Sequence, residues 1–535
     1  MRFFNTAGPV NPRDHYTLSP LCRINLDEII SLIHQKKYFI LHAPRQTGKT
    51  SCLLALMTYL NQTGEYSCLY INVEGAQAAR ENVSGAIGVI ISEIKQRIKQ
   101  YALIPGMNNQ VLNPPSDTNE FTLLNVYLTT LAQFTPHPFI LLIDEIDALV
   151  GDSLISVLRQ IRSGYDKRPD YFPLSVILCG VRDIRDYRIH SSSDKSVITG
   201  GSAFNIKAES LRLDNFSFED ITTLFLQHTE ETGQIFEEPV FKQVWDLTAG
   251  QPWLVNALGY EICFRMPEGK DRTRTITSDM VIQAKENLIL RRETHLDQLT
   301  DKLKEERVRR VIEPIMAGDQ FESGFLSPDV EYVLDIGLIR QEQNGEISIA
   351  NRIYQEVIPR DLSWNAQMGM AVKQSWYLTP DNRLDIPALL IAFQQFFREH
   401  LESWVDIFQY KEVAPQLLLM AFLQRVVNGG GRIDREYGLG RGRVDLYVAW
   451  PISPIIWQRV VIEMKIIRGP CEKTIQDGLT QVYKYADRCG ADEAHLIVFD
   501  QTPGKTWDEK IYRREEVYCG TPDHQCSFPV TVWGM

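Results

Sequence analysis

The sequence has no apolar run long enough to span a bilayer, and its first eight residues contain no secretory hydrophobic segment. It has no cysteine pair with Cys-x-x-Cys spacing, no internal repeat and no low-complexity segment. A net charge of -12 excludes a protein that coats nucleic acid with a surface that is basic throughout. A local basic groove is compatible with this charge. These absences predict a cytoplasmic protein with no membrane partner.

The nine cysteines are scattered along the chain, which favours reduced thiols that serve as small core residues. Cys519, His524 and Cys526 lie close together near the C-terminus, but their spacing is unusual for a metal site, so we interpret it as coincidence. A length of 535 residues is too great for one hydrophobic core and favours roughly three or four domains. An apolar content of 44% is sufficient to form large cores.

Residues 37 to 59 have the pattern of a buried strand, a phosphate-binding loop and a helix. Backbone N–H groups of such a loop, together with the N-terminus of the following helix, attract a nucleotide phosphate. Lys49 would reach the β- and γ-phosphates, and the Thr50 hydroxyl would ligate Mg²⁺. Ala43 replaces the usual first glycine. The candidate nucleotide contacts are Ala43, Pro44, Arg45, Gln46, Thr47, Gly48, Lys49, Thr50 and Ser51.

A second apolar run, residues 139 to 143, ends in Asp144 and Glu145. A buried strand of this kind would place both carboxylates at its C-terminal edge, beside the phosphate loop. Asp144 would hold magnesium through a water molecule, and Glu145 would orient and polarise the attacking water. Asp147 is expected to face solvent or to cap the helix of residues 153 to 162. Together with the loop, this motif predicts a nucleoside triphosphatase.

Other segments near this site leave two interpretations open. Arg182 follows the predicted strand 174 to 179 and is either a sensor of the γ-phosphate or an ion-pair partner of Asp183 or Asp186, with Arg185 as a bystander. Residues 9 to 16 either contact the adenine base or form an exposed segment that leads into the first helix and strand. Arg159 and Arg162 would either reach the site of a neighbouring subunit or lie on an exposed helix face.

These motifs resemble those of the AAA-like, STAND-related ATPases. The resemblance extends to residues 204 to 206, to residues 211 to 216, and to Thr-Ala-Gly-Gln-Pro-Trp-Leu-Val-Asn at 248 to 256. It implies that ATP is the nucleotide and that Pro252 approaches it from a helical lid. Without the resemblance, Pro252 would be the first residue of a helix after a turn.

The region after residue 204 has a helical pattern to residue 300, followed by helices at 305 to 316 and 330 to 337. Two short runs around Asn344-Gly345 predict a β-hairpin. Helices followed by a hairpin resemble a winged helix, which in this group of ATPases binds DNA or serves as a rigid spacer.

From about residue 385 the sequence predicts a separate domain with helices at 389 to 397 and 416 to 427. Strands are expected at 433 to 437, 443 to 448 and 458 to 466, and a run at 496 to 500 would complete the sheet. Asp445 opens one strand, and Glu463-Met464-Lys465 lies on the next. Because residues 463 and 465 project to the same face, Lys465 would lie beside a metal bound by Asp445 and Glu463.

This arrangement resembles the PD-(D/E)XK nuclease family. The resemblance adds Glu412 as an extra metal-binding acid, and Gln481 with Tyr485 as the Q-x-x-x-Y motif of one branch. It implies one or two Mg²⁺ ions, with Glu463, Lys465 and Gln481 in the catalytic machinery. Arg432, Arg435, Arg441 and Arg443 would either neutralise DNA phosphates or pair with Asp434 and Glu436.

We therefore expect an α/β multidomain protein: a P-loop ATPase domain with a parallel sheet (1–204), a helical lid (205–300), a winged helix (301–362), a linker (363–385) and an α/β nuclease-like domain (386–535). The expected function is ATP-controlled, magnesium-dependent cleavage of DNA, in genome defence or control of mobile elements, with RNA as the other possible substrate. The alternative is a nucleotide-dependent scaffold whose nuclease-like domain binds nucleic acid without cutting it. A homo-oligomer or an activating protein partner is compatible with either function.

Overall fold

The computed structural model describes the chain except for residues 105–118, 184–187, 191–196, 200–203, 292–293, 317–326, 343–344, 359–376, 408–413, 428–431, 440–441, 454–455, 468, 501, 503 and 520–526. The chain divides into two compact units. The first comprises Met1–Asp297 and Ser323–Arg352, and the second comprises Gln298–Glu322 and Ile353–Met535. Each unit is described by itself below.

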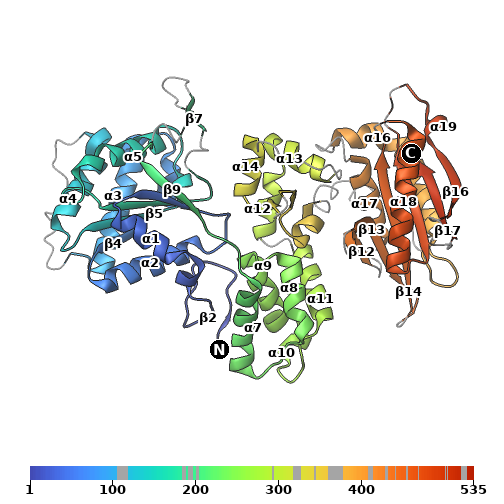
Figure 1. The fold of residues 1–535 in the computed structure, drawn as a ribbon, viewed down its shortest axis with the longest axis horizontal. Coiled ribbons are helices and arrows are strands. Elements are labelled where there is room, and N and C mark those ends of the chain that lie inside the picture. The colour runs from blue at the N-terminus through green and yellow to red at the C-terminus, as the bar shows by residue number, and fades with distance from the viewer. Residues whose placement is uncertain are drawn as a thin grey trace. The chain divides into compact units, whose positions relative to one another are not determined.

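Within the described residues, a five-stranded sheet organises the first unit, with strand order β4-β5-β6-β3-β9 (Figure 1). Its neighbouring strands pair in parallel throughout. The strands are β3 (Tyr38–His42), β4 (Ser67–Asn72), β5 (Phe139–Asp144), β6 (Ser175–Gly180) and β9 (Lys207–Arg212). The continuous apolar sequences of β3, β5 and β6 fit strands that are covered on both faces.

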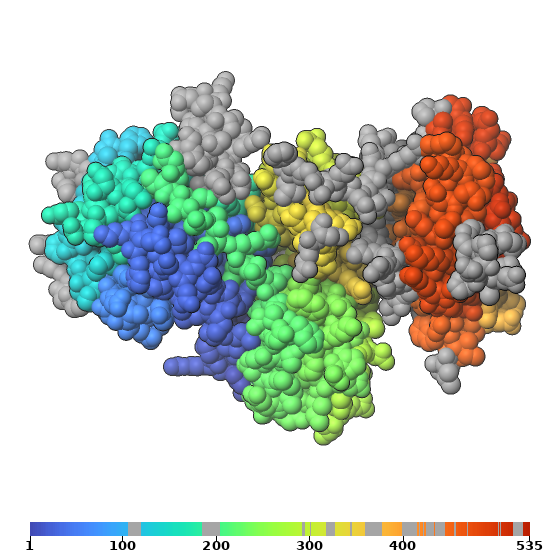
Figure 2. All heavy atoms as spheres, in the orientation of Figure 1, coloured from blue at the N-terminus to red at the C-terminus, as the bar shows by residue number. Residues whose placement is uncertain are grey.

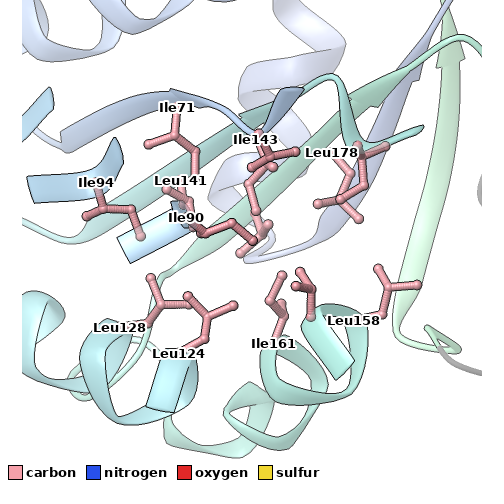
Figure 3. Close-up of a cluster of buried hydrophobic side chains, with 14 of the residues drawn as sticks. Ile71, Ile90, Ile94, Leu124, Leu128, Leu141, Ile143, Leu158, Ile161 and Leu178 are labelled. Atoms are coloured by element: carbon pink, nitrogen blue, oxygen red, sulfur yellow. The ribbon is translucent and has the colours of Figure 1, made fainter. Parts of the chain in front are cut away.

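Helices cover both faces of this sheet. One face packs against α1 (Leu26–His34) and α2 (Lys49–Thr63), and the other packs against α3 (Val83–Tyr101), α4 (Glu120–Phe134) and α5 (Gly151–Ser163). Figure 3 shows Leu124, Leu128 and Ile161 pointing from these helices toward strand residues such as Leu141 and Ile143. This burial of aliphatic side chains stabilises both layers and holds the strand ends in place.

The predicted helices and strands that carry the first site are confirmed, with small shifts at their ends. Three helices begin at an asparagine whose side chain accepts a backbone N–H bond, namely α1 after Asn25, α3 after Asn82 and α4 after Asn119. Short 3₁₀ turns lie at Pro20–Arg23, Glu74–Ala79, Ile146–Ala148 and Tyr165–Lys167.

The helical prediction is wrong for residues 207–212. These residues form β9, which pairs in parallel with β3 at the edge of the sheet. Its sequence, Lys-Ala-Glu-Ser-Leu-Arg, is largely polar because an edge strand is covered less completely than a central one. A short antiparallel pair, β7 (Arg188–His190) and β8 (Val197–Thr199), precedes it.

A group of helices follows β9: α7 (Phe218–Thr232), α8 (Glu238–Thr248), α9 (Pro252–Tyr260), a π-helical turn (Glu261–Arg265), α10 (Pro267–Lys270) and α11 (Ser278–Leu290). The N-terminal strands β1 (Phe3–Phe4) and β2 (His15–Tyr16) pack against them, as Figure 2 shows where dark blue atoms meet green ones. Arg2 pairs with Glu231, and the Trp253 indole donates to the Thr6 carbonyl oxygen at 2.9 Å. The first residues of the chain are therefore part of this helical group.

Beyond it, α12 (Thr294–Lys302) spans the division between the units, and α13 (Glu306–Met316) belongs to the second. Helix α14 (Pro328–Asp335) and the antiparallel pair β10 (Ile339–Gln341) and β11 (Ile347–Ile349) belong to the first. The predicted hairpin is confirmed by that pairing, whereas Asn344 in its turn lies outside the described residues.

The second unit contains a six-stranded sheet among its described residues, with strand order β12-β13-β14-β15-β17-β16. The strands are β12 (Arg432–Leu439), β13 (Gly442–Pro451), β14 (Trp457–Ile466), β15 (Glu493–Phe499), β16 (Tyr512–Cys519) and β17 (Ser527–Gly534). Its helices are α16 (Ile386–Ile407), α17 (Ala414–Val427), α18 (Cys471–Cys489) and α19 (Trp507–Lys510). Helix α18 connects the parallel strands β14 and β15 and packs on the sheet through Ile475, Leu479 and Val482.

The run at 496–500 joins this sheet as predicted, because residues 496–499 belong to β15, which pairs with β14. It is not the last strand, since β15 also pairs with β17 and the sheet continues to β16. Strand β16 contains Arg-Arg-Glu-Glu, which is not the apolar sequence of a buried strand. Strand β17 has buried Val530, Val532 and Trp533, but it also contains Pro529, which is unusual inside a strand.

No helix in the described part of the chain is both long enough and apolar enough to cross a membrane. The predicted linker, residues 363–385, lies outside the described residues as far as residue 376.

Candidate functional site

The phosphate loop follows directly from β3. The Ala43 N–H donates to the Gly180 carbonyl oxygen at 3.2 Å, which ties the start of the loop to the end of β6. Gln46 and Gly48 both adopt positive φ angles, 59° and 94°, and α2 begins at Lys49. Such a turn before a helix N-terminus directs backbone N–H groups into one concave cradle for an anion.

The loop requires a glycine at position 48 but not at position 43. Ala43 is 1% exposed and lies in the apolar cluster beneath the loop, and its φ angle is not positive, so a methyl group is accommodated there. Gly48 combines a φ of +94° with close packing, because a Cβ atom there would lie 2.7 Å from Nη1 of Arg23. The departure from the usual first glycine therefore leaves the cradle intact.

Lys49 is buried inside the curve of the loop. Its Nζ donates to the carbonyl oxygens of Ala43 and Pro44, both at 3.0 Å, and the side chain is 5% exposed. An ammonium group at this position lies where the loop N–H groups converge, which suits an anionic ligand.

The structure brings Asp144 to the loop even though β6 lies between β5 and β3. The Thr50 hydroxyl donates to Oδ2 of Asp144 at 2.7 Å, and the carboxylate is fully buried. A hydroxyl and a carboxylate in this arrangement are oxygen ligands of the kind that Mg²⁺ prefers, so these residues fit a magnesium–nucleotide complex. Thr50 would contact the ion, and Asp144 would hold one of its water molecules.

Glu145, the next residue, is held in an unusual conformation. Its φ and ψ angles are 56° and 41°, in the left-handed region that glutamate rarely adopts. Burial raises the pKa of Glu145, and the nearby Asp147 raises it further. A strained, partly buried carboxylate beside a phosphate loop has the environment expected of a general base.

The expectation for Asp147 is wrong. Its Oδ1 accepts a hydrogen bond from the Val181 N–H at 3.2 Å, and the residue before α5 is Val150. Asp147 therefore anchors the end of β6 and does not cap the helix.

The structure places Arg182 beside a residue that the sequence did not suggest. Asp183 pairs with Lys207 at 2.5 Å, and Asp186 and Arg185 lie outside the described residues. Arg182 instead faces Asp335 at the end of α14, with Nε 3.7 Å from Oδ2, and its guanidinium lies over the Tyr332 ring. Arg159 and Arg162 are exposed on α5.

A cavity opens beside the loop. It is lined by the segments 5–8, 16–18, 46–48 and 51–52 and by Val10, Pro20, Arg23, Phe216, Leu224, Pro252, Trp253 and Asn256. Pro252 is the first residue of α9 and lies in this wall, as expected. Val10 bonds through its N–H to the Ser51 hydroxyl at 3.1 Å, so the N-terminal segment forms part of the wall.

Two residues at this site were missed from the sequence. Arg23 donates to the carbonyl oxygens of Thr47 and Asp214 and stacks on Phe216, 4.7 Å from the ring centroid. Tyr70 on β4 donates to Asp144 at 3.0 Å. No local pattern marks either residue, because both depend on partners that are distant in the sequence.

The acids of the second unit meet where β13 pairs with β14. The Met464 N–H donates to Oδ2 of Asp445 at 2.7 Å, and the Asp445 N–H lies 3.5 Å from Oε2 of Glu463. Lys465 Nζ lies 2.8 Å from Oε1 of Glu463, which confirms that residues 463 and 465 lie side by side. Glu412 and Arg441 lie outside the described residues, as do the side chains of Arg432, Arg435 and Arg443.

Two acids and a lysine set the electrostatics of this second cluster. Glu463 is 3% exposed, and burial followed by the charge of Asp445 raises its pKa. Burial lowers the pKa of Lys465, but Glu463 and Asp445 outweigh that effect, so its pKa is raised overall. Among the described residues, no three His, Cys, Asp or Glu side chains form a metal-binding group.

Gln481 lies on α18, which packs against β14. Gln481 is exposed, whereas Tyr485, one turn later, is 9% exposed and lies in the core beneath the helix. The two residues of the predicted motif therefore differ in burial.

No protein-family model matches the sequence, and no curated protein matches it. Solved structures with a similar fold include a Walker-type ATPase of Pyrococcus abyssi, with 16% identity, a TM-score of 0.45 and coverage of 66% of this chain and 99% of that chain. Cdc6p of Pyrobaculum aerophilum gives 15% identity, a TM-score of 0.35 and coverage of 68% and 96%.

The RuvB Holliday junction branch migration motor of Thermotoga maritima gives 14% identity, a TM-score of 0.31 and coverage of 62% and 95%. All three TM-scores are below 0.5, so the functional argument depends on this chain's own residues. The protein has a mixed α/β fold, and its five-stranded parallel sheet, with the loop before α2 and the Thr50–Asp144 contact, is consistent with a P-loop ATPase domain.

Proposed function

We propose that the first unit binds and hydrolyses ATP with Mg²⁺ at the loop of residues 43–51. Lys49 binds the β- and γ-phosphates, and Thr50 and Asp144 hold the metal. Glu145 polarises the attacking water, Arg182 senses the γ-phosphate, and Pro252 contacts the nucleotide from the lid. The observation that carries this proposal is the 2.7 Å bond from Thr50 to Asp144 beside the buried Lys49.

The second unit is proposed to be a magnesium-dependent nuclease that cleaves DNA. Asp445 and Glu463 bind the metal with Glu412, Lys465 lies beside the metal-bound water, and Gln481 orients the lysine or contacts phosphate. Support comes from the contact between Lys465 and Glu463 and from the crossing of α18 between two parallel strands.

The proposed domain order is an ATPase domain extended through β9, a lid to residue 300, a winged helix at 301–362, a linker at 363–385 and a nuclease-like domain at 386–535. ATP binding would change the lid and the winged helix and so control the nuclease. A scaffold that binds nucleic acid without cutting it is the second candidate, and RNA is the alternative substrate. An oligomer or an activating partner fits either function.

Cleavage of plasmid DNA with Mg²⁺ tests this proposal, using the wild type, Glu463→Ala and the control Glu472→Ala, each with and without ATP. Glu472 is an exposed acid on α18 of the same unit. Cleavage by the wild type and the control but not by Glu463→Ala would support the nuclease. Equal cleavage by all three would overturn the site assignment.

ATP hydrolysis by the same proteins and by Lys49→Ala tests the first unit separately. Loss of hydrolysis in Lys49→Ala alone would support the loop assignment. Hydrolysis without any cleavage of DNA or RNA would favour the scaffold.

A further inference from the structure

Among the described residues, the Asp144 carboxylate has hydrogen bonds with Thr50, with the Glu145 N–H, with Tyr70 and with the Cys179 thiol. Tyr70 lies outside the motifs of the loop and of β5. Oδ2 accepts from the Thr50 hydroxyl at 2.7 Å, and Oδ1 accepts from the Glu145 N–H at 3.0 Å. The Tyr70 hydroxyl also donates to Oδ2, at 3.0 Å. Two hydroxyl groups therefore converge on one carboxylate oxygen.

The sheet places Tyr70 for this contact. Tyr70 on β4 is in register with Leu142 on β5, and Asp144 lies two residues further along on the same face. The Tyr70 side chain is 2% exposed and lies in the cluster between the sheet and α2. The Arg97 guanidinium lies over its ring, 5.4 Å from the centroid. The ring is thus fixed on several sides.

The hydroxyl of Tyr70 acts as a donor. A carboxylate oxygen only accepts, so the phenol O–H that lies 3.0 Å from Oδ2 of Asp144 donates to it. An ionised carboxylate offers about four acceptor positions. The bonds from Thr50, Tyr70 and Glu145 together set the plane of the carboxylate.

We infer that Tyr70 is a positioning residue of the magnesium–nucleotide site and acts by fixing the Asp144 carboxylate. This inference rests on the proposed ATPase function. Groups that orient a metal-binding carboxylate act on metal affinity as strongly as many direct ligands do. Tyr70 therefore governs affinity for the metal–nucleotide complex, while affinity for the nucleotide alone is independent of it.

The test compares wild type with Tyr70→Phe, which removes one oxygen atom and keeps the ring. Tyr127→Phe is the matched control, because Tyr127 is a buried tyrosine on α4 whose hydroxyl has no hydrogen-bond partner among the described residues. The probes are ADP alone, measured by calorimetry, and Mn²⁺ with ADP, measured by the electron paramagnetic resonance of free Mn²⁺. The acids of the second unit also attract Mn²⁺ in the absence of nucleotide. The measured quantity is therefore the additional Mn²⁺ that binds when ADP is present.

Tyr70→Phe should bind Mn²⁺ with ADP about 10-fold more weakly than wild type and bind ADP alone equally well. Tyr127→Phe should match wild type in both. In an Asp144→Asn background, adding Tyr70→Phe should cause no further loss, because the acceptor has already been changed.

Equal Mn²⁺ binding by Tyr70→Phe and wild type would overturn the inference while leaving the ATPase function intact. An equal loss for ADP alone would also overturn it, since that result indicates a general structural defect. A further loss in the Asp144→Asn background would show that Tyr70 acts through another group. Failure of the wild type to bind ADP at all would overturn the proposed function and this inference together.

Discussion

Asp335 lies between Arg182 and His42 at the carboxyl edge of the parallel sheet. Its Oδ2 is 3.7 Å from Nε of Arg182, and its Oδ1 is 3.9 Å from Nδ1 of His42. Burial and the nearby Arg212 lower the pKa of His42 to about 4, so Arg182 is the charged partner of Asp335 near neutral pH. A third contact, from Arg212 to the Leu334 carbonyl oxygen at 3.1 Å, holds the end of α14 at the same place.

Asp335→Asn should strengthen ATP binding about 5-fold, because Arg182 would no longer be shared between Asp335 and a phosphate. Glu331→Gln, on the exposed face of α14, is the control and should leave affinity unchanged. Calorimetric titration with ATP measures both. Unchanged or weaker binding by Asp335→Asn would show that Arg182 does not contact the nucleotide.

Glu145→Gln should reduce ATP hydrolysis by about 10²- to 10⁴-fold, because an amide cannot accept a proton from the attacking water. ATP binding should persist, and the melting temperature should not fall, since the substitution removes a carboxylate whose pKa burial has raised. Turnover and binding measured on the same preparation separate the two effects. Hydrolysis at the wild-type rate would contradict the assignment of Glu145 as the base.

Lys465→Ala should abolish nucleic-acid cleavage while ATP hydrolysis continues, because Lys465 belongs to the second unit alone. The control is Lys473→Ala, an exposed lysine on α18. A plasmid cleavage assay and a phosphate-release assay run in parallel provide the measurement. Cleavage that persists in Lys465→Ala would exclude this residue from the reaction.

Gly48→Ala should destabilise the first unit by more than Gly64→Ala does. Both glycines have positive φ angles, but a Cβ at Gly48 meets Arg23 at 2.7 Å, whereas a Cβ at Gly64 has open space around it. The left-handed conformation alone costs about 1–2 kcal/mol, and the contact with Arg23 adds to it. Denaturant unfolding of both variants checks this order. Equal losses would mean that Arg23 moves aside without cost.

His295→Phe should make the stability of the first unit less dependent on pH between about 4 and 6.5. Burial lowers the pKa of His295 to about 4, and its ring stacks on Trp253 with centroids 4.8 Å apart. The unfolded state binds a proton below about pH 6.5, so wild-type stability falls as pH drops toward 4 by up to about 1.4 kcal/mol per unit. Phenylalanine keeps the ring and removes this titration.

Unfolding midpoints of wild type and His295→Phe at pH 7.5 and pH 5 provide the measurement. Lowering the pH from 7.5 to 5 should reduce the stability of the wild type more than that of His295→Phe. A constant difference would show that His295 does not remain neutral in the folded protein.

Local sequence patterns were sufficient for the elements that carry the first site. The helix expected at 153–162 is α5 with nearly the same ends, and the apolar runs before Ala43 and Glu145 are β3 and β5. These elements could be predicted because periodicity, caps and apolar runs act over a few neighbouring residues. The edge strands β9 and β16 and the internal strand β17 were missed because polar or proline-containing sequences become strands only when a partner strand is available.

The sequence alone determined the chemistry that the chain offers: a loop with Lys49 and Thr50, a strand that ends in Asp144 and Glu145, and a second pair of acids with Lys465. Only the tertiary structure decided which groups meet, placing Tyr70 on Asp144 and Asp335 beside Arg182. The physical reason is that strand order and long-range packing set these contacts across 74 residues for Tyr70 and Asp144, beyond the reach of local conformational preference.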